Sequence, residues 1–299
     1  SLEQLDAKDA PLEIDPKPPG RVRWLGTTVM AYEGKKRFPY STKYTVTIPR
    51  GAKSAVGGQL QEEKTFSFQT PTVKIASMLP SRGTRHAKPE SPLVLTFNQA
   101  VDPQAVAAHT ILRTAAGETV NLEVVSHSKW KSVPIFGKLW KNWDKKRTVV
   151  FKPKKVLRKN TSYSVVITAG LGSLEGPLET PHNQTTGFTT YGPLVVRCAG
   201  CYWHCRPCRP TSTPSVRFSN GIRTADEALE KFFRLQPAVD DLQLQARGSR
   251  VYLNGTFKPA TTYRITVKPG LTDIYDQKME KTFKGTIPIK DARPDLRFP

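Results

Sequence analysis

Acidic residues and long apolar runs are both scarce in this sequence. Only 25 Asp and Glu stand against 46 Lys and Arg, which leaves a formal net charge of +21 and a pI near 9.9. No run approaches the roughly 18 apolar residues that a membrane-spanning helix needs, and no basic segment followed by an apolar core stands near Ser1 to indicate a signal peptide. The positive charge favours polyanionic partners: nucleic acid, anionic lipid head groups or acidic polysaccharide. Because salt screens such attraction, charge alone assigns no activity.

The sequence also lacks the motifs of the common enzyme classes. It has no P-loop, no dinucleotide fingerprint and no nucleophile-elbow serine, and its five histidines are scattered without zinc-hydrolase spacing. Two acidic pairs, Asp240 with Asp241 and Asp273 with Asp276, lack the alternating ligands of a calcium loop, so we interpret them as turn-capping residues. We therefore expect no catalytic residue, no metal and no cofactor, and we predict that the chain is not an enzyme.

Short β-rich runs between prolines and glycines are what the sequence does contain. Its 25 Pro and 20 Gly break up long helices, while 37% hydrophobic residues are too many for a disordered chain. Alternation of apolar and polar residues predicts strands at 44–48, 66–68, 93–97, 148–151, 163–168, 250–253 and 263–267. Helix is predicted over 104–109, after an N-cap Asp102 and Pro103, and over 224–233, where Thr224 and Glu227 have capping-box spacing. The predicted fold class is all-β, with minor short helices.

One pattern occurs three times along the chain. It is Thr-x-Tyr with a Gly seven residues after the Tyr, and its copies are Tyr44 with Gly51, Tyr163 with Gly170, and Tyr263 with Gly270. Each copy is followed by an aromatic–Thr strand ending, at 66–70, 188–190 and 283–286. The tyrosines lie 119 and 100 residues apart, a spacing that suits tandem Ig-like β-sandwiches rather than a short-repeat solenoid. We interpret each Tyr as a structural corner residue and each Gly as a position with positive φ.

The repeat predicts the domain organisation. We expect an Ig-like domain over 1–71, a second over 72–190 with a basic Trp-rich insert at 126–150, a third over 191–288 with a Cys-rich entry segment, and a linker over 289–299 to a following domain. A strand leading into Phe97-Asn-Gln-Ala-Val101 or Phe218-Ser-Asn-Gly-Ile222 opens the second and third copies, but the first copy has no such strand. The first domain is therefore expected to be N-terminally incomplete and to leave a sheet edge or core face uncovered.

Several motifs together resemble the N-terminal Ig-like region of bacterial α2-macroglobulin-like proteins. They are Trp24-Leu-Gly-Thr27, Pro39-Tyr-Ser-Thr-Lys-Tyr-Thr-Val-Thr-Ile-Pro-Arg-Gly51, Phe97-Asn-Gln-Ala-Val-Asp102 and Arg293-Pro-Asp-Leu-Arg-Phe298, in the family's order over nearly the whole chain. The resemblance implies a large bacterial cell-envelope protein, periplasmic and lipid-anchored or secreted, that traps proteases. No Cys-Gly-Glu-Gln thioester or bait region lies in this stretch, so the implied role is that of a non-catalytic N-terminal arm. Its implied partners are the remaining domains of the same polypeptide and, through the full-length protein, target proteases.

A second class of function stays open. A tandem Ig-like adhesin or S-layer-type surface protein could use the same sandwiches and bind acidic envelope polysaccharide through its basic insert. The chain beyond residue 299 would separate the two classes. A macroglobulin-like protein continues into further β-sandwich domains with a bait region, whereas an adhesin continues into more repeats or an anchor.

Four cysteines, Cys198, Cys201, Cys205 and Cys208, fall within eleven residues. In an oxidising envelope they would form two disulfides, and of the three possible pairings the nested one, 198–208 with 201–205, suits a hairpin best. A tetrahedral zinc site is the main alternative, although its CxxC pairs are usually separated by a longer loop. Iron–sulfur ligation and redox-active thiols are less favoured. We interpret His204 as an exposed loop residue rather than a ligand.

The basic insert and the strand after it are the second unusual segment. From Lys129 to Lys159 there are twelve Lys and Arg and one acid, Asp144, together with three of the five tryptophans. The plainer interpretation is a long β-hairpin whose tryptophans pack on the sandwich while its cations stay solvated. Otherwise the segment contacts anionic envelope polymer or lipid head groups, with nucleic acid the least favoured partner because no nucleic-acid-binding motif accompanies it. The candidate contact residues are Lys129, Trp130, Lys131, Lys138, Trp140, Lys141, Trp143, Lys145, Lys146 and Arg147.

Overall fold

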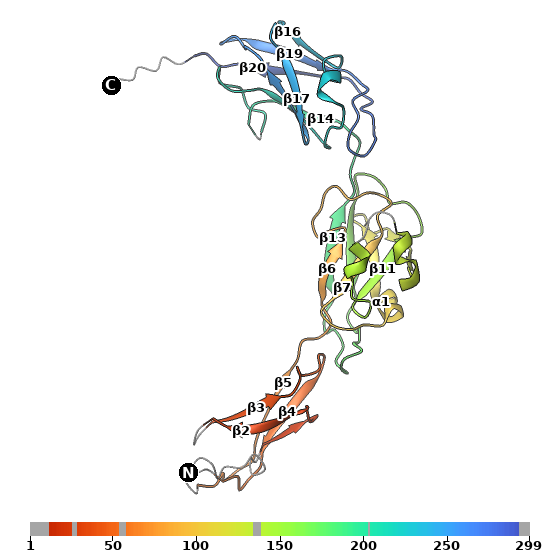
Figure 1. The fold of residues 1–299 in the computed structure, drawn as a ribbon, viewed down its shortest axis with the longest axis vertical. Coiled ribbons are helices and arrows are strands. Elements are labelled where there is room, and N and C mark those ends of the chain that lie inside the picture. The colour runs from red at the N-terminus through yellow and green to blue at the C-terminus, as the bar shows by residue number, and fades with distance from the viewer. Residues whose placement is uncertain (1–11, 26–28, 54–57, 134–138, 203, 293–299) are drawn as a thin grey trace, which may run out of the picture. The chain divides into compact units, whose positions relative to one another are not determined.

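The computed structural model describes residues 12–25, 29–53, 58–133, 139–202 and 204–292 (Figure 1). The Arg293–Phe298 motif, Lys138 and the first eleven residues lie outside these ranges. The chain divides into two compact units. The first comprises residues 1–84, 90–157 and 162–188, and the second comprises 85–89, 158–161 and 189–299. The all-β prediction is confirmed: in the described ranges, helix is limited to α1 (Pro103–His109) and short 3-10 turns.

The N-terminal part of the first unit, residues 12–71, is called the first sandwich here. It has a sheet in the order β1-β4-β5 and a separate β2-β3 hairpin. Tyr44 and Val46 are buried on one face of the middle strand, β4, and their partners across the sheet are Phe68 and Phe66 of β5. The five strands are β1 (Glu13–Asp15), β2 (Gly20–Trp24), β3 (Met30–Gly34), β4 (Lys43–Ile48) and β5 (Lys64–Gln69).

The second sandwich, residues 72–190, has two four-stranded sheets. One has the order β10-β11-β7-β6 and the other the order β13-β12-β8-β9. Their strands are β6 (Ile75–Leu79), β7 (Leu93–Phe97), β8 (Thr110–Thr114), β9 (Thr119–Val120), β10 (Leu122–Val124), β11 (Thr148–Pro153), β12 (Ser162–Ile167) and β13 (Gln184–Thr189). Leu95, Phe97 and Phe151 of the first sheet and Tyr163 and Ile167 of the second are all buried, as the alternation of apolar residues requires.

The third sandwich, residues 191–292, repeats this plan with fewer strands. Its sheets have the orders β14-β15-β18-β17 and β16-β19-β20. One continuous core, including Val216, Phe218, Tyr263 and Ile265, lies between them. The strands are β14 (Val196–Gly200), β15 (Ser215–Phe218), β16 (Phe233–Gln236), β17 (Gln243–Arg247), β18 (Arg250–Asn254), β19 (Thr262–Val267) and β20 (Phe283–Pro288).

The seven predicted strands all occur, but only one of the two predicted helices does. Helix α1 begins as expected, with the Asp102 carboxylate accepting a hydrogen bond from the Ala105 N–H at 2.9 Å. The helix predicted over 224–233 is wrong: only Asp226–Ala228 forms a 3-10 turn, and Phe233 starts β16. The Thr224 hydroxyl accepts from the Thr272 N–H at 2.9 Å instead of capping a helix. Pairing of Phe233 with Val267 of β19 outweighs the local helical preference.

The Thr-x-Tyr repeat occupies the same place in all three sandwiches. Each Tyr is buried on the strand between two neighbours of its sheet, and the three glycines have φ values of 85°, 88° and 108°. The repeat extends further upstream than the sequence pattern suggested. The residue three positions before each Tyr has a φ of 51°, and the next Thr hydroxyl donates to a backbone carbonyl two residues earlier at 2.9 Å. These residues are Ser41 with Thr42, Asn160 with Thr161, and Ala260 with Thr261.

Candidate functional site

The basic insert packs on the outer face of the sheet that contains β7 and β11. It connects the antiparallel strands β10 and β11 but forms two 3-10 helices, η3 (His127–Ser132) and η5 (Leu139–Asn142), beside the sheet (Figure 1). The predicted hairpin therefore exists, but the prediction that it is long is wrong. Trp130 is buried in a small cluster with Val94 and Val150, and its indole N–H donates to the Val125 carbonyl at 3.1 Å. Because Val94 and Val150 point away from the main core, Trp130 gives this sheet a second covered face. It is a packing residue.

Trp143 extends this cluster toward the surface. Its ring centroid lies 5.5 Å from that of Trp130 in an edge-to-face arrangement, and the residue is half-buried. Arg147 lies 3.5 Å from Asp144 and 3.7 Å from Glu175, so part of its charge is compensated. The backbone of Trp140 belongs to η5. The remaining described cations of the candidate set are exposed: Lys129, Lys131, Lys141, Lys145 and Lys146.

Two hollows border the insert. The larger, of about 400 Å³, lies between the insert and the outer face of β6 and β7 and is lined by Trp143, Asp144 and Arg147 together with Ser77 and Thr96. The smaller, of about 250 Å³, lies between His127, Trp130 and the start of α1. An indole beside hydroxyls and charged groups can contact a sugar ring and bind its polar substituents. The lining of the larger hollow thus combines an apolar ring with polar and charged groups.

The four cysteines form two disulfides, Cys198–Cys205 and Cys201–Cys208, so the nested pairing is wrong. The hairpin register explains the difference. Cys201 exchanges two backbone hydrogen bonds with Arg206, at 2.9 and 2.8 Å, which places Cys205 one residue out of register with Cys201. A shift of one residue moves a side chain to the other face of a strand pair. Cys201 therefore meets Cys208 on one face, and Cys198 meets Cys205 on the other.

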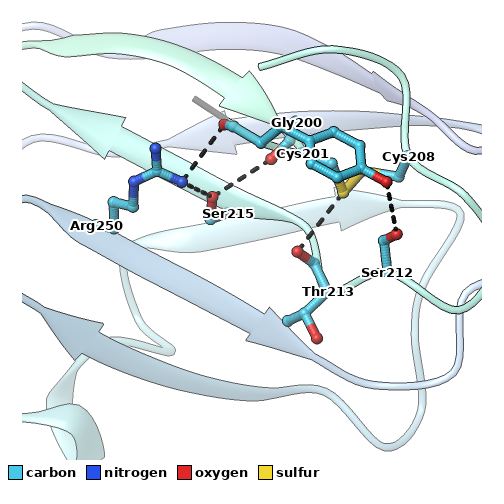
Figure 2. The surroundings of a disulfide bond; sticks show 8 residues. Gly200, Cys201, Cys208, Ser212, Thr213, Ser215 and Arg250 are labelled. Carbon is cyan, nitrogen blue, oxygen red and sulfur yellow. Dashed lines mark hydrogen bonds between the residues drawn. A yellow bond between two sulfur atoms is a disulfide. The ribbon is translucent and has the colours of Figure 1, made fainter. Parts of the chain in front are cut away.

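The two disulfides have different surroundings. Cys201 and Cys208 are buried in the core of the third sandwich, whereas Cys198 and Cys205 are partly exposed. The Cys208 N–H donates to the Pro288 carbonyl and its carbonyl accepts from the Lys290 N–H, both at 2.8 Å, so the buried disulfide also contacts the end of β20. Figure 2 shows Arg250 of β18 reaching toward this loop, where it donates to the Tyr202 carbonyl and the Ser215 hydroxyl at 3.4 Å. All four sulfur atoms are engaged in disulfides, and no cluster of His, Cys, Asp or Glu in the described ranges could hold a metal.

Buried polar side chains that the sequence analysis missed lie two residues after Phe97 and Phe218. Gln99 accepts from Ser41 and Ser173 hydroxyls at 2.9 and 2.7 Å and donates to the Pro71 carbonyl at 3.2 Å. Asn220 donates to Asp273 at 2.7 Å and to the Gly192 carbonyl at 2.9 Å. Both side chains thus bind a carbonyl of the segment that leads into the first strand of their own sandwich, β6 or β14. The alignment of Phe97-Asn-Gln with Phe218-Ser-Asn was the signal that could have identified them.

Two of the four acidic residues weighed as calcium ligands, Asp241 and Asp273, hold loops through hydrogen bonds. Asp273 is buried and accepts from the N–H groups of Tyr275 and Gln277 at 2.9 Å, in addition to Asn220. Asp241 accepts from the Thr256 N–H at 2.8 Å and the Thr256 hydroxyl at 2.7 Å. The backbone hydrogen bond, followed by the hydroxyl, holds the pKa of Asp241 below its usual value.

Comparison with known proteins agrees with this architecture. Residues 71–190 match the family of bacterial Ig-like domains, so the second sandwich is similar to a bacterial Ig-like domain. The chain is 22% identical, over 307 aligned positions, to an alpha-2-macroglobulin homolog of Nostoc sp.; the alignment covers 95% of this chain and 16% of that protein. The predicted resemblance to an Ig-like region of an α2-macroglobulin-like protein is confirmed. The chain is also 25% identical over 170 residues to circularly permutated Ras protein 2 of Dictyostelium discoideum, covering 55% of this chain and 4% of that protein.

Similar solved structures include the N-terminal part of the bacterial S-layer protein SbsC, with a TM-score of 0.28 and 15% identity, covering 74% of this chain and 44% of that one. The LD transpeptidase LdtMt1 in complex with imipenem has a TM-score of 0.25 and 20% identity, covering half of each chain. Scores this low leave the function of this chain unconstrained.

Proposed function

We propose that this chain is the non-catalytic N-terminal arm of an α2-macroglobulin-like protein that traps proteases in the bacterial cell envelope. The observation that carries the proposal is the alignment with the Nostoc homolog, which runs through 95% of this chain. The chain spans only 16% of that relative, so trapping itself would belong to the whole polypeptide. The arm would hold the trapping body at a distance from its attachment point and pack against the domains beside it.

The polar groups of the sandwiches support a role without catalysis. Gln99, Asn220 and Asp273 are buried, and each has hydrogen-bond partners within the fold that hold a loop or a linker carbonyl. Such satisfied groups stabilise a conformation and leave no reactive atom poised for a substrate. We therefore propose that the chain is not an enzyme.

The cysteines support a location in the periplasm or elsewhere in the envelope, with the protein secreted or lipid-anchored. Disulfides persist in oxidising compartments, and this chain has two within eleven residues. Across the ranges that the structure describes, no helix is long and apolar enough to cross a membrane.

Incubation with trypsin- and elastase-type proteases tests the arm. The chain alone should leave protease activity on a large protein substrate and on a small peptide substrate unchanged, whereas the full-length protein should suppress only the activity on the large one. Suppression by the chain alone would contradict the passive-arm role. Unchanged activity with the full-length protein would contradict protease trapping.

A second candidate function, binding of acidic envelope polysaccharide, is favoured by the larger hollow. Trp143 lines that hollow, and the exposed Lys141, Lys145 and Lys146 belong to the same insert. With polygalacturonate as the probe, substitution of the three lysines by Gln should weaken binding about tenfold, because each exposed ion pair is worth up to about 1 kcal/mol. The matched control replaces Lys278, Lys281 and Lys284 of the third sandwich, which are also exposed. Equal losses from both variants would show charge attraction without a site.

A further inference from the structure

The first sandwich exposes an aromatic side chain at a position that the other two bury. Phe68 lies opposite Tyr44 on β5 and is 39% exposed. Its counterpart in the second sandwich, Phe188, stacks on Tyr163 and is 4% exposed. In the third sandwich Ile287 lies opposite Tyr263 and is 0% exposed. The same position of the repeat is thus open to solvent in the first sandwich and buried in the other two.

The exposed phenylalanines are on the core face of their sheet. Phe68 stacks on Tyr44 with ring centroids 5.2 Å apart, and Tyr44 is itself buried. Phe66, two residues earlier, pairs with the buried Val46 and therefore shares this face, yet it is 55% exposed. Side chains two residues apart on a strand point the same way. The part of the core face beneath β5 is consequently open to solvent.

The other sandwiches cover this place with strands of the facing sheet. In the second, β11 pairs with β7 and β7 with β6, and the Thr186 hydroxyl of β13 contacts the buried Met78 of β6 at 3.0 Å. In the third, β18 pairs with β15 and β15 with β14. In the first sandwich, β3 is the strand that precedes the repeat tyrosine's strand, β4. In the other two sandwiches β11 precedes β12 and β18 precedes β19 in the same way. Within the part of the chain that the structure describes, β3 pairs with β2 alone.

We propose that the first sandwich binds an extended strand of its own polypeptide along the free edge of β3, and that the side chains of this strand cover Phe66 and Phe68. The chemistry of the strand follows from its two counterparts. Both β7 (Leu93–Phe97) and β15 (Ser215–Phe218) bury apolar residues and end in a Phe, followed two residues later by Gln99 or Asn220. In the second and third sandwiches this strand, β7 or β15, precedes its neighbour in the sheet, β11 or β18, along the same chain. By analogy, the strand beside β3 would come from the same polypeptide. The proposal rests on the repeat and is independent of protease trapping.

The binding surface can be tested with a strand supplied in trans. The probe is a synthetic peptide with the sequence of residues 91–101, SPLVLTFNQAV, which contains β7 and the polar residues after it. It should bind saturably and slow amide hydrogen exchange in β3 by about tenfold or more, because added ladder hydrogen bonds protect the strand. A control peptide with Ser at the positions of Leu93, Leu95 and Phe97 should not bind. Equal protection by both peptides, or by neither, would overturn the proposal.

A protein variant tests whether the two phenylalanines form the surface. Phe66→Ser with Phe68→Ser should abolish peptide binding, and because both residues are already exposed the fold should persist, as exchange around Tyr163 and Tyr263 would show. The matched control is Leu174→Ser, which changes a residue of 66% exposure in the second sandwich and should leave binding intact. Retained binding by the double variant would place the peptide elsewhere.

The source of the strand is tested with the parent polypeptide. If the strand is supplied in cis, β3 and β5 in the parent should already exchange about as slowly as β11 and β13, and the added peptide should not bind. Rapid exchange in the parent would overturn the cis source. Dimerisation of the chain that Phe66→Ser and Phe68→Ser abolish would assign a second copy as the occupant instead.

Discussion

The first and second sandwiches share one sheet plan and differ in the strands that face it. Both place a buried Tyr on a middle strand and a Gly with positive φ after it. The second sandwich faces this sheet with four strands, and its insert covers those strands again through Trp130. Among the residues that the structure describes, the first has only the two strands of the β2-β3 hairpin outside this sheet. The repeat motif therefore specifies one sheet. The strands that face this sheet lie outside the motif, and they determine how much of the core is buried from solvent.

Truncation of the repeat tyrosine should produce the largest difference between the two sandwiches. Tyr163→Ala should cost about 3–5 kcal/mol, since it leaves a cavity in a closed core. Tyr44→Ala should cost about 2 kcal/mol, because the neighbouring Phe68 is open to water and the site can be filled more easily. Chemical denaturation, with hydrogen exchange in β12 and β4 as the local readout, measures the loss of unfolding free energy in each variant. Equal losses would mean that the two cores are equally closed.

Substitutions of Trp130 and Trp143 should distinguish the role of the insert in packing from its role in binding. Trp130→Ala should destabilise the second sandwich by about 3 kcal/mol, because a fully buried indole that donates a hydrogen bond is lost. Trp143→Ala, at a half-buried position, should cost about 1 kcal/mol and should weaken polysaccharide binding more than Trp130→Ala does. Thermal unfolding and the polygalacturonate assay give the two readouts. The reverse order in stability would show that the insert is held by Trp143 instead.

In the third sandwich, the buried disulfide and the partly exposed one allow the same comparison of buried with exposed positions. Replacing Cys201 and Cys208 by Ala should cost about 2–3 kcal/mol, while replacing Cys198 and Cys205 by Ser should cost about 1 kcal/mol less, since that pair is partly exposed and outside the core. Under mild reductant, mass spectrometry after alkylation should show Cys198 and Cys205 labelled first. Simultaneous labelling of all four would indicate that the loop opens as one unit.

The smallest expected effect is the pH response of the contact between Asp241 and Thr256. Its pKa is lowered in the folded protein by the Thr256 hydrogen bonds, so its stabilisation is present above the carboxyl's ordinary pKa and is lost as pH falls through the folded value. Asp241→Asn should therefore reduce the dependence of stability on pH below 4, roughly the ordinary carboxyl pKa, and change little at neutral pH. Denaturation midpoints of the wild type and the variant across acidic pH provide the measurement. Parallel curves would assign the acid response to other carboxylates.

Signals within a few neighbouring residues predicted the strands and the start of α1. Alternating apolar residues identified strands such as Leu93–Phe97 to the residue, and Asp102 with Pro103 identified the start of α1. The capping-box pattern at Thr224 failed because Thr224 bonds to Thr272, 48 residues away. Such a contact has no local trace in the sequence.

The candidate site was less predictable, because its features depend on register and on distant partners. A one-residue offset in the hairpin, with Cys201 opposite Arg206, decided the disulfide pairing. The insert was recognisable from its charge and tryptophans, but its 3-10 turns follow from the way Trp130 packs on Val94 and Val150. Gln99 looked like an ordinary polar residue until the fold placed it against the Pro71 carbonyl.

The disulfide-linked hairpin also determines how the third sandwich would respond to tension along the chain. A stretched segment of seven residues spans about 24 Å, but the Cα atoms of Cys198 and Cys205 are held 5.9 Å apart and those of Cys201 and Cys208 5.1 Å apart. The entry to this sandwich is thus a short, inextensible link with little hidden length. A pull arriving through β14 meets the Cys198–Cys205 bond and then the Cys201–Cys208 bond, and Cys208 is hydrogen-bonded to Pro288 and Lys290, where β20 ends. Force would therefore pass between the two ends of the sandwich through two disulfides and a pair of backbone hydrogen bonds.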